Sequence, residues 1–96
     1  MKSLDCSLIK TQNEFWNEYL NVVDTEGAEY FGRNLDAFWD ALSAGGPGHP
    51  KDLSELSLTN SNALKTIDAG AFHTKLASLA QDLLACNHSD FVLQLE

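Results

Sequence analysis

Three short segments with strand-like patterns lie far apart in this chain, and helical patterns fill both gaps between them. They cover residues 3–8, 53–59 and 91–95, and the last is apolar except at Gln94. Apolar residues occupy every second position of the first segment: Leu4, Cys6 and Leu8. Because each gap is long enough for a crossover, we expect parallel strands with right-handed connections. The nearly continuous apolar run at the end favours a strand covered on both faces.

The first gap carries the patterns of two helices. One begins with Thr11 and Glu14, which have the spacing of a capping box, where each side chain accepts from the other residue's backbone N–H. Its core-facing residues follow at helical spacing: Phe15, Trp16, Tyr19, Leu20 and Val23. The second helix begins after Asn34, a residue whose side chain is well suited to cap the first turn.

The second gap also predicts two helices. A short one covers 60–67 and opens at Asn60 or Ser61, and a longer one is capped by Asp68 and ends near 86–88. The longer helix has a clear apolar stripe: Phe72, Leu76, Leu79, Ala80 and Leu83. The predicted fold class is therefore α/β, a small three-stranded parallel sheet packed by about four helices.

Length and composition restrict the kind of protein this can be. The chain has 96 residues, which suggests one domain, and its 44% hydrophobic content predicts a folded globule. The net charge of −8 argues against a nucleic-acid ligand and suits a basic protein partner. No apolar run is long enough to span a membrane, and the first residues do not form a signal peptide. We therefore expect a cytoplasmic protein in which Cys6 and Cys86 are reduced.

Several chemistries lack the residues they need. The histidines His49, His73 and His88 do not form a metal-ligand pattern with either cysteine, so no metal or cofactor is expected. The glycines of 45–48 lack the lysine and helix of a phosphate-binding loop. Two carboxylates on one exposed helix face do not flank a cleft as an acid and base pair would. The sequence therefore does not predict an enzyme.

The segment 30–42 carries the densest information. We expect Gly32 to take a backbone conformation closed to other residues, just before the helix that Asn34 caps. The helix has a core-facing apolar stripe: Leu35, Phe38, Trp39 and Leu42. Asp36 and Asp40 lie to one side of it, one turn apart. The helix dipole explains Asp36, but Asp40 lies beyond the first turn and repels Asp36.

Negative charge is concentrated around this helix. Between Asp24 and Asp40, five acidic residues and Arg33 sum to −4, half the net charge of −8. Such a patch can speed the encounter with a cationic partner. The following segment, 43–50, is rich in glycine and proline, so we expect a mobile loop that offers a second contact segment beginning at Ser43.

The run Tyr30-Phe31-Gly32-Arg33-Asn34-Leu35-Asp36-Ala37-Phe38-Trp39-Asp40-Ala41-Leu42 resembles the signature segment of the barstar family, small intracellular inhibitors of secreted ribonucleases. The resemblance is dense within this run. In the rest of the chain it rests on the order of the predicted strands and helices. The resemblance implies the same α/β architecture and a guanyl-specific microbial ribonuclease as the partner. One departure is that 43–50 contains no aromatic residue, whereas barstar-like proteins often carry aromatic contacts near this position.

The resemblance also implies roles for individual residues. Asp40 would replace an RNA phosphate in the enzyme's active site, with Asp36 as a second anchor. The other residues that it places at the interface are Tyr30, Gly32, Arg33, Asn34, Trp39, Ser43 and Asp82, and Glu29 would steer association. Arg33 would either reduce repulsion between the acids or set partner choice. We expect a one-to-one complex and a free monomer. The alternative is an acidic adaptor that binds a different basic protein through the same face.

Overall fold

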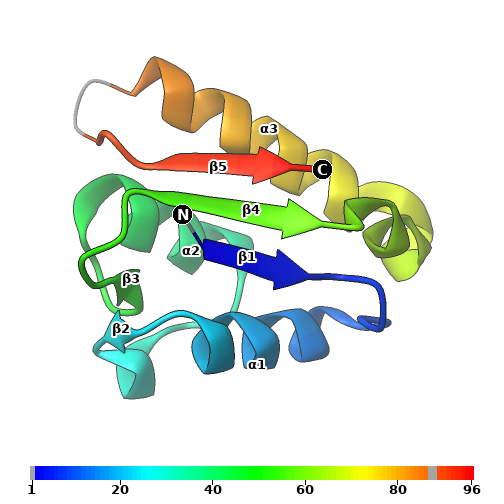
Figure 1. Ribbon diagram of the computed structural model, residues 1–96, viewed down its shortest axis with the longest axis horizontal. Coiled ribbons are helices and arrows are strands. Elements are labelled where there is room, and N and C mark those ends of the chain that lie inside the picture. Colours follow the sequence, from blue (N-terminus) through cyan, green and yellow to red (C-terminus); the bar gives the residue numbers. More distant parts are fainter. Residues whose placement is uncertain (1, 87–88) are drawn as a thin grey trace.

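A computed structural model describes residues 2–86 and 89–96 and contains the expected parallel sheet. Its strands are β1 (Lys2–Asp5), β4 (Glu55–Thr59) and β5 (Val92–Leu95), in the spatial order β1-β4-β5 (Figure 1). Both pairings are parallel, and the register aligns Leu4 with Leu58 and Leu58 with Leu95. The predicted α/β class and its three-stranded parallel sheet are confirmed, with β4 at the centre.

Three α-helices connect and cover these strands: α1 (Gln12–Val22), α2 (Leu35–Ala44) and α3 (Ala71–Ala85). Two 3-10 segments, η1 (Ala28–Tyr30) and η2 (Ser61–Gly70), take the remaining helical turns, so the expected short helix at 60–67 is a 3-10 segment. In Figure 1, α2 lies behind the sheet, α1 runs below β1 and α3 lies beyond β5. None of the described helices is long and apolar enough to cross a membrane.

The sheet buries one face and leaves the other polar. The buried face carries leucines from all three strands: Leu4, Leu56, Leu58 and Leu93. Across the opposite face runs a polar row of paired residues, Ser3, Ser57 and Gln94, of which Ser3 and Gln94 are exposed. The prediction that β5 is covered on both faces is therefore wrong. Strand β5 lies at the edge of the sheet and its Gln94 belongs to the polar row, so helices cover only its other face.

An aromatic cluster from the helices fills the space behind the sheet. Phe15 and Trp16 of α1 meet Phe38 of α2 and Phe72 of α3 edge to face, with ring centroids 5.3–6.2 Å apart. Such edge-to-face pairs add to the stabilisation from burial alone. The predicted core stripes of all three helices are confirmed at these positions. The cluster joins α2 firmly to the rest of the molecule.

Two details at the start of the chain differ from expectation. Strand β1 ends at Asp5, whose carboxylate accepts from the backbone N–H of Ser7 at 2.9 Å, and Leu8 is 83% exposed instead of continuing the strand. The Thr11 cap is confirmed, since its Oγ1 accepts from the N–H of Glu14 at 3.1 Å. The second hydrogen bond of the capping box is shifted by one residue, because the Glu14 carboxylate accepts from the N–H of Lys10 and not from that of Thr11.

The start of α3 also differs. Asp68 is not its cap: the helix begins at Ala71 after Gly70, and no side chain caps it. Asp68 instead has φ 51° and accepts from the Gln12 side chain at 2.6 Å. The short segment η2 does open at Ser61 with Asn60 before it, as expected, but the Asn60 side chain makes no capping bond and its amide donates to Asp5 at 3.0 Å. Both polar residues bond across the fold to β1 or α1, which local pattern could not reveal. Helix α3 ends at Ala85, with Asn87 and His88 outside the described residues.

Candidate functional site

The first turn of α2 is held as the sequence predicts. Asn34 Oδ1 accepts from the backbone N–H of Ala37 at 2.7 Å, and the Asn34 amide donates to the Gly32 carbonyl at 3.2 Å. The cap satisfies one of the unpaired donors at this helix end. It also places Asp36 in the first turn, where the helix dipole favours a negative charge.

Gly32 is needed for space and not for its backbone conformation. The left-handed residue of this turn is Arg33, with φ 53°, so the expectation for Gly32 is wrong. A Cβ on Gly32 would lie 3.1 Å from the Cβ of Ala37 and 3.4 Å from the amide nitrogen of Asn34. The turn therefore packs directly against α2, which leaves little room for a side chain at residue 32.

Arg33 points towards α1 and away from the acids of α2. Its guanidinium donates to Asn17 Oδ1 at 2.5 Å and approaches Asn13 Oδ1 at 3.4 Å. Within residues 2–86 and 89–96, it forms no ion pair with Asp36 or Asp40. The structure therefore gives no support to a role for Arg33 in reducing the repulsion between those two carboxylates.

Helix α2 packs on α3, and a hollow of about 380 Å³ lies at their junction. Three residues predicted for the site line it together: Asp36 and Trp39 from α2, and Asp82 from α3. Both carboxylates are exposed and Trp39 is half-buried. We call Asp36, Trp39, Asp40 and Asp82 the α2 face. The hollow brings Asp82 next to residues that lie far from it in the sequence.

Lys75 is a residue of this surface that sequence reasoning did not assign to the site. It lines the same hollow and a neighbouring one of about 530 Å³ that also includes Asp36. It is the one Lys or Arg among the residues described as lining these two hollows. Its spacing could have revealed it, because Lys75 lies seven residues, or two helical turns, before Asp82 and so shares its side of α3.

Asp40 lies near the other end of α2, where the chain turns into the 43–50 segment. Its carboxylate is exposed and rests directly against the Cα of Gly46. Its backbone carbonyl accepts from the N–H groups of Gly45 and Gly46, which close the helix. The carboxylate therefore lies near the negative end of the helix dipole, an unfavourable place for an anion that lacks a partner.

The 43–50 segment is tied to the body of the protein. Its β3 (His49–Pro50) forms an antiparallel ribbon with β2 (Thr25–Glu26), which the sequence did not predict. The Gly48 N–H donates to the Glu26 carbonyl at 2.6 Å, and the Tyr19 hydroxyl donates to the Gly48 carbonyl at 2.8 Å. The expectation of a mobile loop is therefore wrong, because the five glycine and proline residues of this segment are compatible with an ordered turn that long-range hydrogen bonds hold.

The remaining predicted residues divide by exposure. Tyr30, at the end of η1, is 77% exposed, and Glu29 beside it is also exposed. Ser43 is buried, and its hydroxyl donates to the carbonyl of Trp39 at 2.6 Å within α2. Tyr30 and Glu29 are thus free to meet a partner, whereas the hydroxyl of Ser43 already has an internal acceptor.

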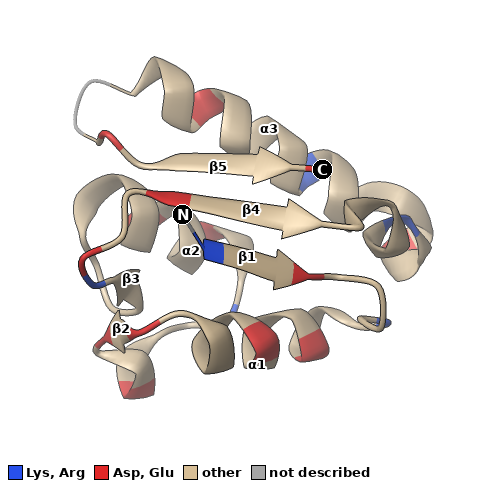
Figure 2. Cartoon of the chain, in the orientation of Figure 1, with Lys and Arg blue, Asp and Glu red and all other residues tan. Residues whose placement is uncertain are grey.

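The carboxylates of the α2 face have no internal partners. Among the described residues, Asp36, Asp40 and Asp82 accept no hydrogen bond and form no ion pair. Figure 2 shows that acidic residues also occur on α1, α3 and the end of β1, so charge alone does not single out this face. What this face adds is that two exposed carboxylates without a partner, Asp36 and Asp82, line one hollow together with the half-buried ring of Trp39.

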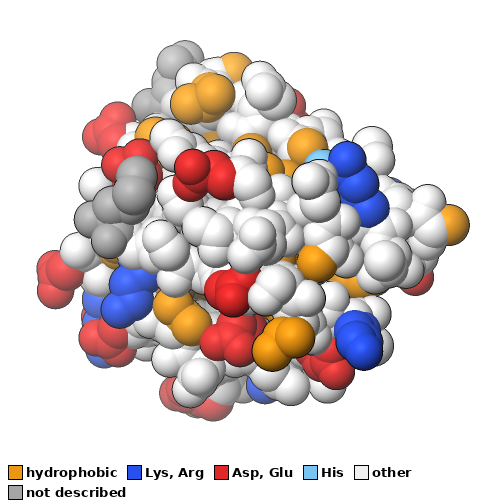
Figure 3. Space-filling model, turned by 45° about the vertical axis from the view of Figure 1, so that its right-hand side comes forward, with side chains coloured by type: hydrophobic (Ala, Val, Ile, Leu, Met, Phe, Trp, Pro, Cys, Tyr) orange, Lys and Arg blue, Asp and Glu red, His pale blue; other side chains and the backbone are white. Residues whose placement is uncertain are grey.

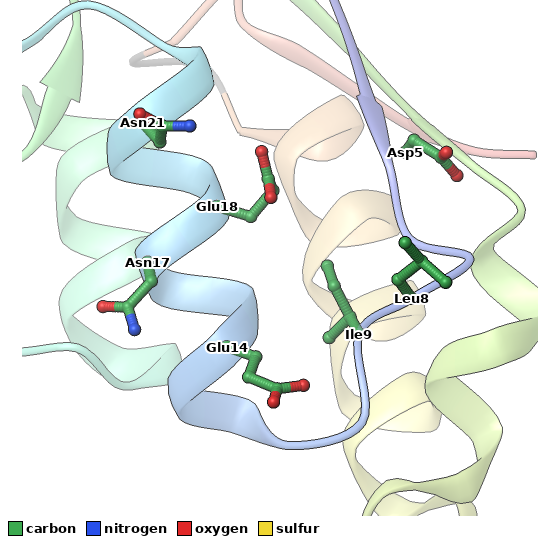
Figure 4. Close-up of a pocket in the computed structure, with 7 residues that line it drawn as sticks. All are labelled: Asp5, Leu8, Ile9, Glu14, Asn17, Glu18 and Asn21. Carbon is green, nitrogen blue, oxygen red and sulfur yellow. The ribbon is translucent and has the colours of Figure 1, made fainter.

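A larger hollow, of about 700 Å³, lies between α1 and the loop after β1. Figure 4 shows Asp5, Glu14 and Glu18 around Leu8 and Ile9, and Figure 3 shows acidic and hydrophobic side chains side by side on the surface turned forward. Asp5 accepts from Ser7 and Asn60, and Glu14 accepts from Lys10. These two carboxylates already stabilise local structure, so size alone does not make this hollow the better site.

The described residues contain no cluster of three or more His, Cys, Asp or Glu that could hold a metal ion, and His88 lies outside them. Cys6 and Cys86 are both free thiols. Burial raises the pKa of Cys6 to about 12, with the negative charges of Asp5 and Glu18 acting in the same direction. Cys6 is therefore a protonated core residue and not a reactive nucleophile.

Comparison with protein families identifies a match. The family model described as "Barstar (barnase inhibitor)" matches residues 1–95, which is nearly the whole chain. No curated protein matches the sequence. The family description agrees with the resemblance of the segment at 30–42 and with the architecture of sheet and helices. Members of that family are inhibitors of barnase-type ribonucleases and not enzymes.

Proposed function

This chain belongs to the barstar family of ribonuclease inhibitors, and we propose that it inhibits a secreted guanyl-specific ribonuclease by filling the active site with the α2 face. The single observation that carries the proposal is the state of Asp40. Its carboxylate is exposed, has no partner among the described residues and lies near the negative end of a helix. A cationic cleft would relieve that unfavourable position.

Asp40 would act as a substitute for an RNA phosphate. Ribonuclease active sites hold phosphate with cationic side chains, and a carboxylate can accept paired hydrogen bonds from an arginine in the same way. Catalysis would be blocked because the site is occupied, and the inhibitor would perform no chemistry. Asp36, one turn away on α2, would provide a second anchor.

The junction of α2 and α3 would make a second part of the contact. Asp36, Trp39 and Asp82 line one hollow there, so a cationic side chain of the nuclease could meet two carboxylates and an aromatic ring together. Trp39 is half-buried, which holds its ring before binding, and Tyr30, at the end of η1 and before α2 in the chain, is exposed. Aromatic residues with these properties often dominate interface energetics.

The residues before α2 would have more limited roles. The backbone at 32–34 is exposed and would approach the enzyme closely. Arg33 is bonded to α1, so it would influence partner choice from the rim. Glu29 would steer association, and Ser43, whose hydroxyl is bonded within α2, would support the helix end beside Asp40.

Charge also supports the choice of partner. The net charge of −8 would attract a basic nuclease and raise the association rate, and added salt would lower that rate. In this proposal the protein acts in the cytoplasm as an immunity protein. It would be a monomer when free and would form a one-to-one complex with the nuclease that the same cell exports, which protects the producer's RNA.

A titration tests this function directly. A barnase-type ribonuclease is mixed with increasing amounts of the protein, and RNA cleavage is measured. We expect activity to disappear at a one-to-one ratio. Asp40→Ala should raise the inhibition constant far more than Lys51→Ala, a change at an exposed residue that is not part of the α2 face. Binding without loss of activity would instead favour an adaptor of basic proteins, and equal effects of the two substitutions would remove Asp40 from the contact.

A further inference from the structure

Gly46 is a glycine whose backbone does not require one. The described glycines with positive φ are Gly27, Gly45, Gly48 and Gly70, and Gly46 is not among them. Its φ therefore does not require a glycine. The constraint is instead steric: a Cβ on Gly46 would overlap Oδ2 of Asp40 and lie 2.8 Å from Asp40 Cγ. The absent side chain leaves the space that the carboxylate occupies.

The Gly46 peptide is held firmly beneath that carboxylate. Its N–H donates to the Asp40 carbonyl at 3.2 Å, and its carbonyl accepts from the His49 N–H at 3.1 Å. His49 belongs to β3, which is paired with β2, so the support extends into the ribbon. Because the backbone is anchored on both sides, an added Cβ would displace the carboxylate more easily than the backbone.

We propose that Gly46 is a positioning residue for Asp40. Its bare Cα supports the carboxylate and restricts the rotamers that Asp40 can adopt before the nuclease binds. This inference rests on the proposed function and adds a residue from outside α2 to its mechanism. A paired contact with an arginine depends on geometry, since a supporting shell that is about 1 Å too loose can disable a site.

Gly46→Ala should therefore weaken inhibition without removing any contact or charge. The expected loss is about tenfold to a hundredfold, the size associated with a misplacement of about 1 Å. The dissociation rate should rise while the association rate stays nearly constant, because the charge that steers encounter is unchanged. Folding should persist, since the atom that must move is the free end of a side chain.

A double-mutant cycle tests the coupling. Inhibition constants of a barnase-type ribonuclease are measured for Gly46→Ala, for Asp40→Ala and for the double variant, with urea unfolding of each. We expect Gly46→Ala to weaken inhibition when Asp40 is present and to add nothing when Asp40 is alanine. Pro47→Ala is the matched control, because Pro47 is the exposed neighbour and the change adds no atom near Asp40.

Each other outcome overturns a specific statement. Equal losses in both backgrounds, no loss from Gly46→Ala, or a variant that does not fold would overturn the positioning role and leave the proposed function intact. An Asp40→Ala variant that inhibits as well as the original protein would instead overturn the assignment of Asp40 in the proposed function. As a separate measurement, side-chain coupling constants should show that Gly46→Ala changes the χ1 rotamer of Asp40.

Discussion

The two acidic surfaces of this protein look alike in composition but differ in how their carboxylates are used. Beside α1, Asp5 accepts hydrogen bonds from Ser7 and Asn60, and Glu14 accepts from Lys10. On the α2 face, the described residues offer no such donor to Asp36, Asp40 or Asp82. Bonding state, and not the number of acids or the size of a hollow, therefore identifies Asp5 and Glu14 as structural acids, whereas Glu18 beside them accepts no hydrogen bond from the described residues.

The largest expected effect comes from removing one acid from each surface and measuring both nuclease inhibition and stability. Asp40→Ala should cost about 2–5 kcal/mol of binding free energy, the range for truncating one partner of a desolvated charge pair. It should change the free energy of unfolding by less than about 0.5 kcal/mol, because the side chain is exposed and unbonded. Nuclease inhibition and urea unfolding measure the two quantities.

Glu14→Ala is the matched variant on the other surface. It removes the acceptor of the Lys10 N–H and should lower stability by about 0.5–1.5 kcal/mol while inhibition is retained. The comparison would be broken if Glu14→Ala weakened inhibition as much as Asp40→Ala, because a bonded acid would then also be a contact residue.

Two helix caps give the next effect in size. Thr11→Ala and Asn34→Ala each remove one side-chain acceptor for a first-turn N–H, at 3.1 and 2.7 Å in the structure. Each should lower stability by about 1 kcal/mol. Only Asn34→Ala should also weaken inhibition, because Asn34 caps the helix that carries the α2 face. Parallel losses of inhibition in both variants would show that global stability controls it.

A substitution of Lys75 should have a smaller effect on binding than the preceding variants, and of opposite sign. Lys75→Met removes the one described Lys or Arg of the hollows beside Asp36 and makes the net charge one unit more negative than −8. Association with a basic nuclease should become faster at low salt, by an amount equivalent to about 0.2–1 kcal/mol. The gain should vanish in high salt. Stopped-flow association rates measure it, and a slower association at low salt would mean that the nuclease presents an acid to Lys75.

The smallest effect concerns the pH dependence of the bonded surface. Hydrogen bonds from Asn60 and then Ser7 lower the pKa of Asp5 below its ordinary value. The folded state therefore binds fewer protons than the unfolded state in acid, so this contribution is present above about pH 4 and is lost as the pH falls through the lowered pKa. In urea unfolding, Asp5→Asn should be less stable than the original protein at pH 7, with the difference shrinking towards pH 3. A difference independent of pH would contradict the assignment.

The candidate site was largely visible in the sequence wherever local rules apply. Helical spacing placed Asp36 and Asp40 to one side of the apolar stripe of α2. The N-cap preference placed Asn34 at the start of this helix, where the structure confirms it. The errors occurred where a residue's partner lies elsewhere in the chain. Arg33 shares a segment with the acids of α2, which suggested that it reduces their repulsion or sets partner choice, yet its acceptors are on α1. Asp68 is of a residue type common at helix N-caps, but its carboxylate accepts a hydrogen bond from the Gln12 side chain.

The sequence by itself determined the order along the chain of the three sheet strands and of the helices α1, α2 and α3, the apolar stripe of each of these helices and the acidic character of α2. These follow from periodicity and capping, which act within about one or two turns. Only the tertiary structure decided that Asp82 and Lys75 share a hollow with Asp36, that the ribbon of β2 and β3 holds the 43–50 segment, and that Gly46 lies under Asp40. Such contacts depend on how whole elements pack through an aromatic core, so no short-range pattern encodes them.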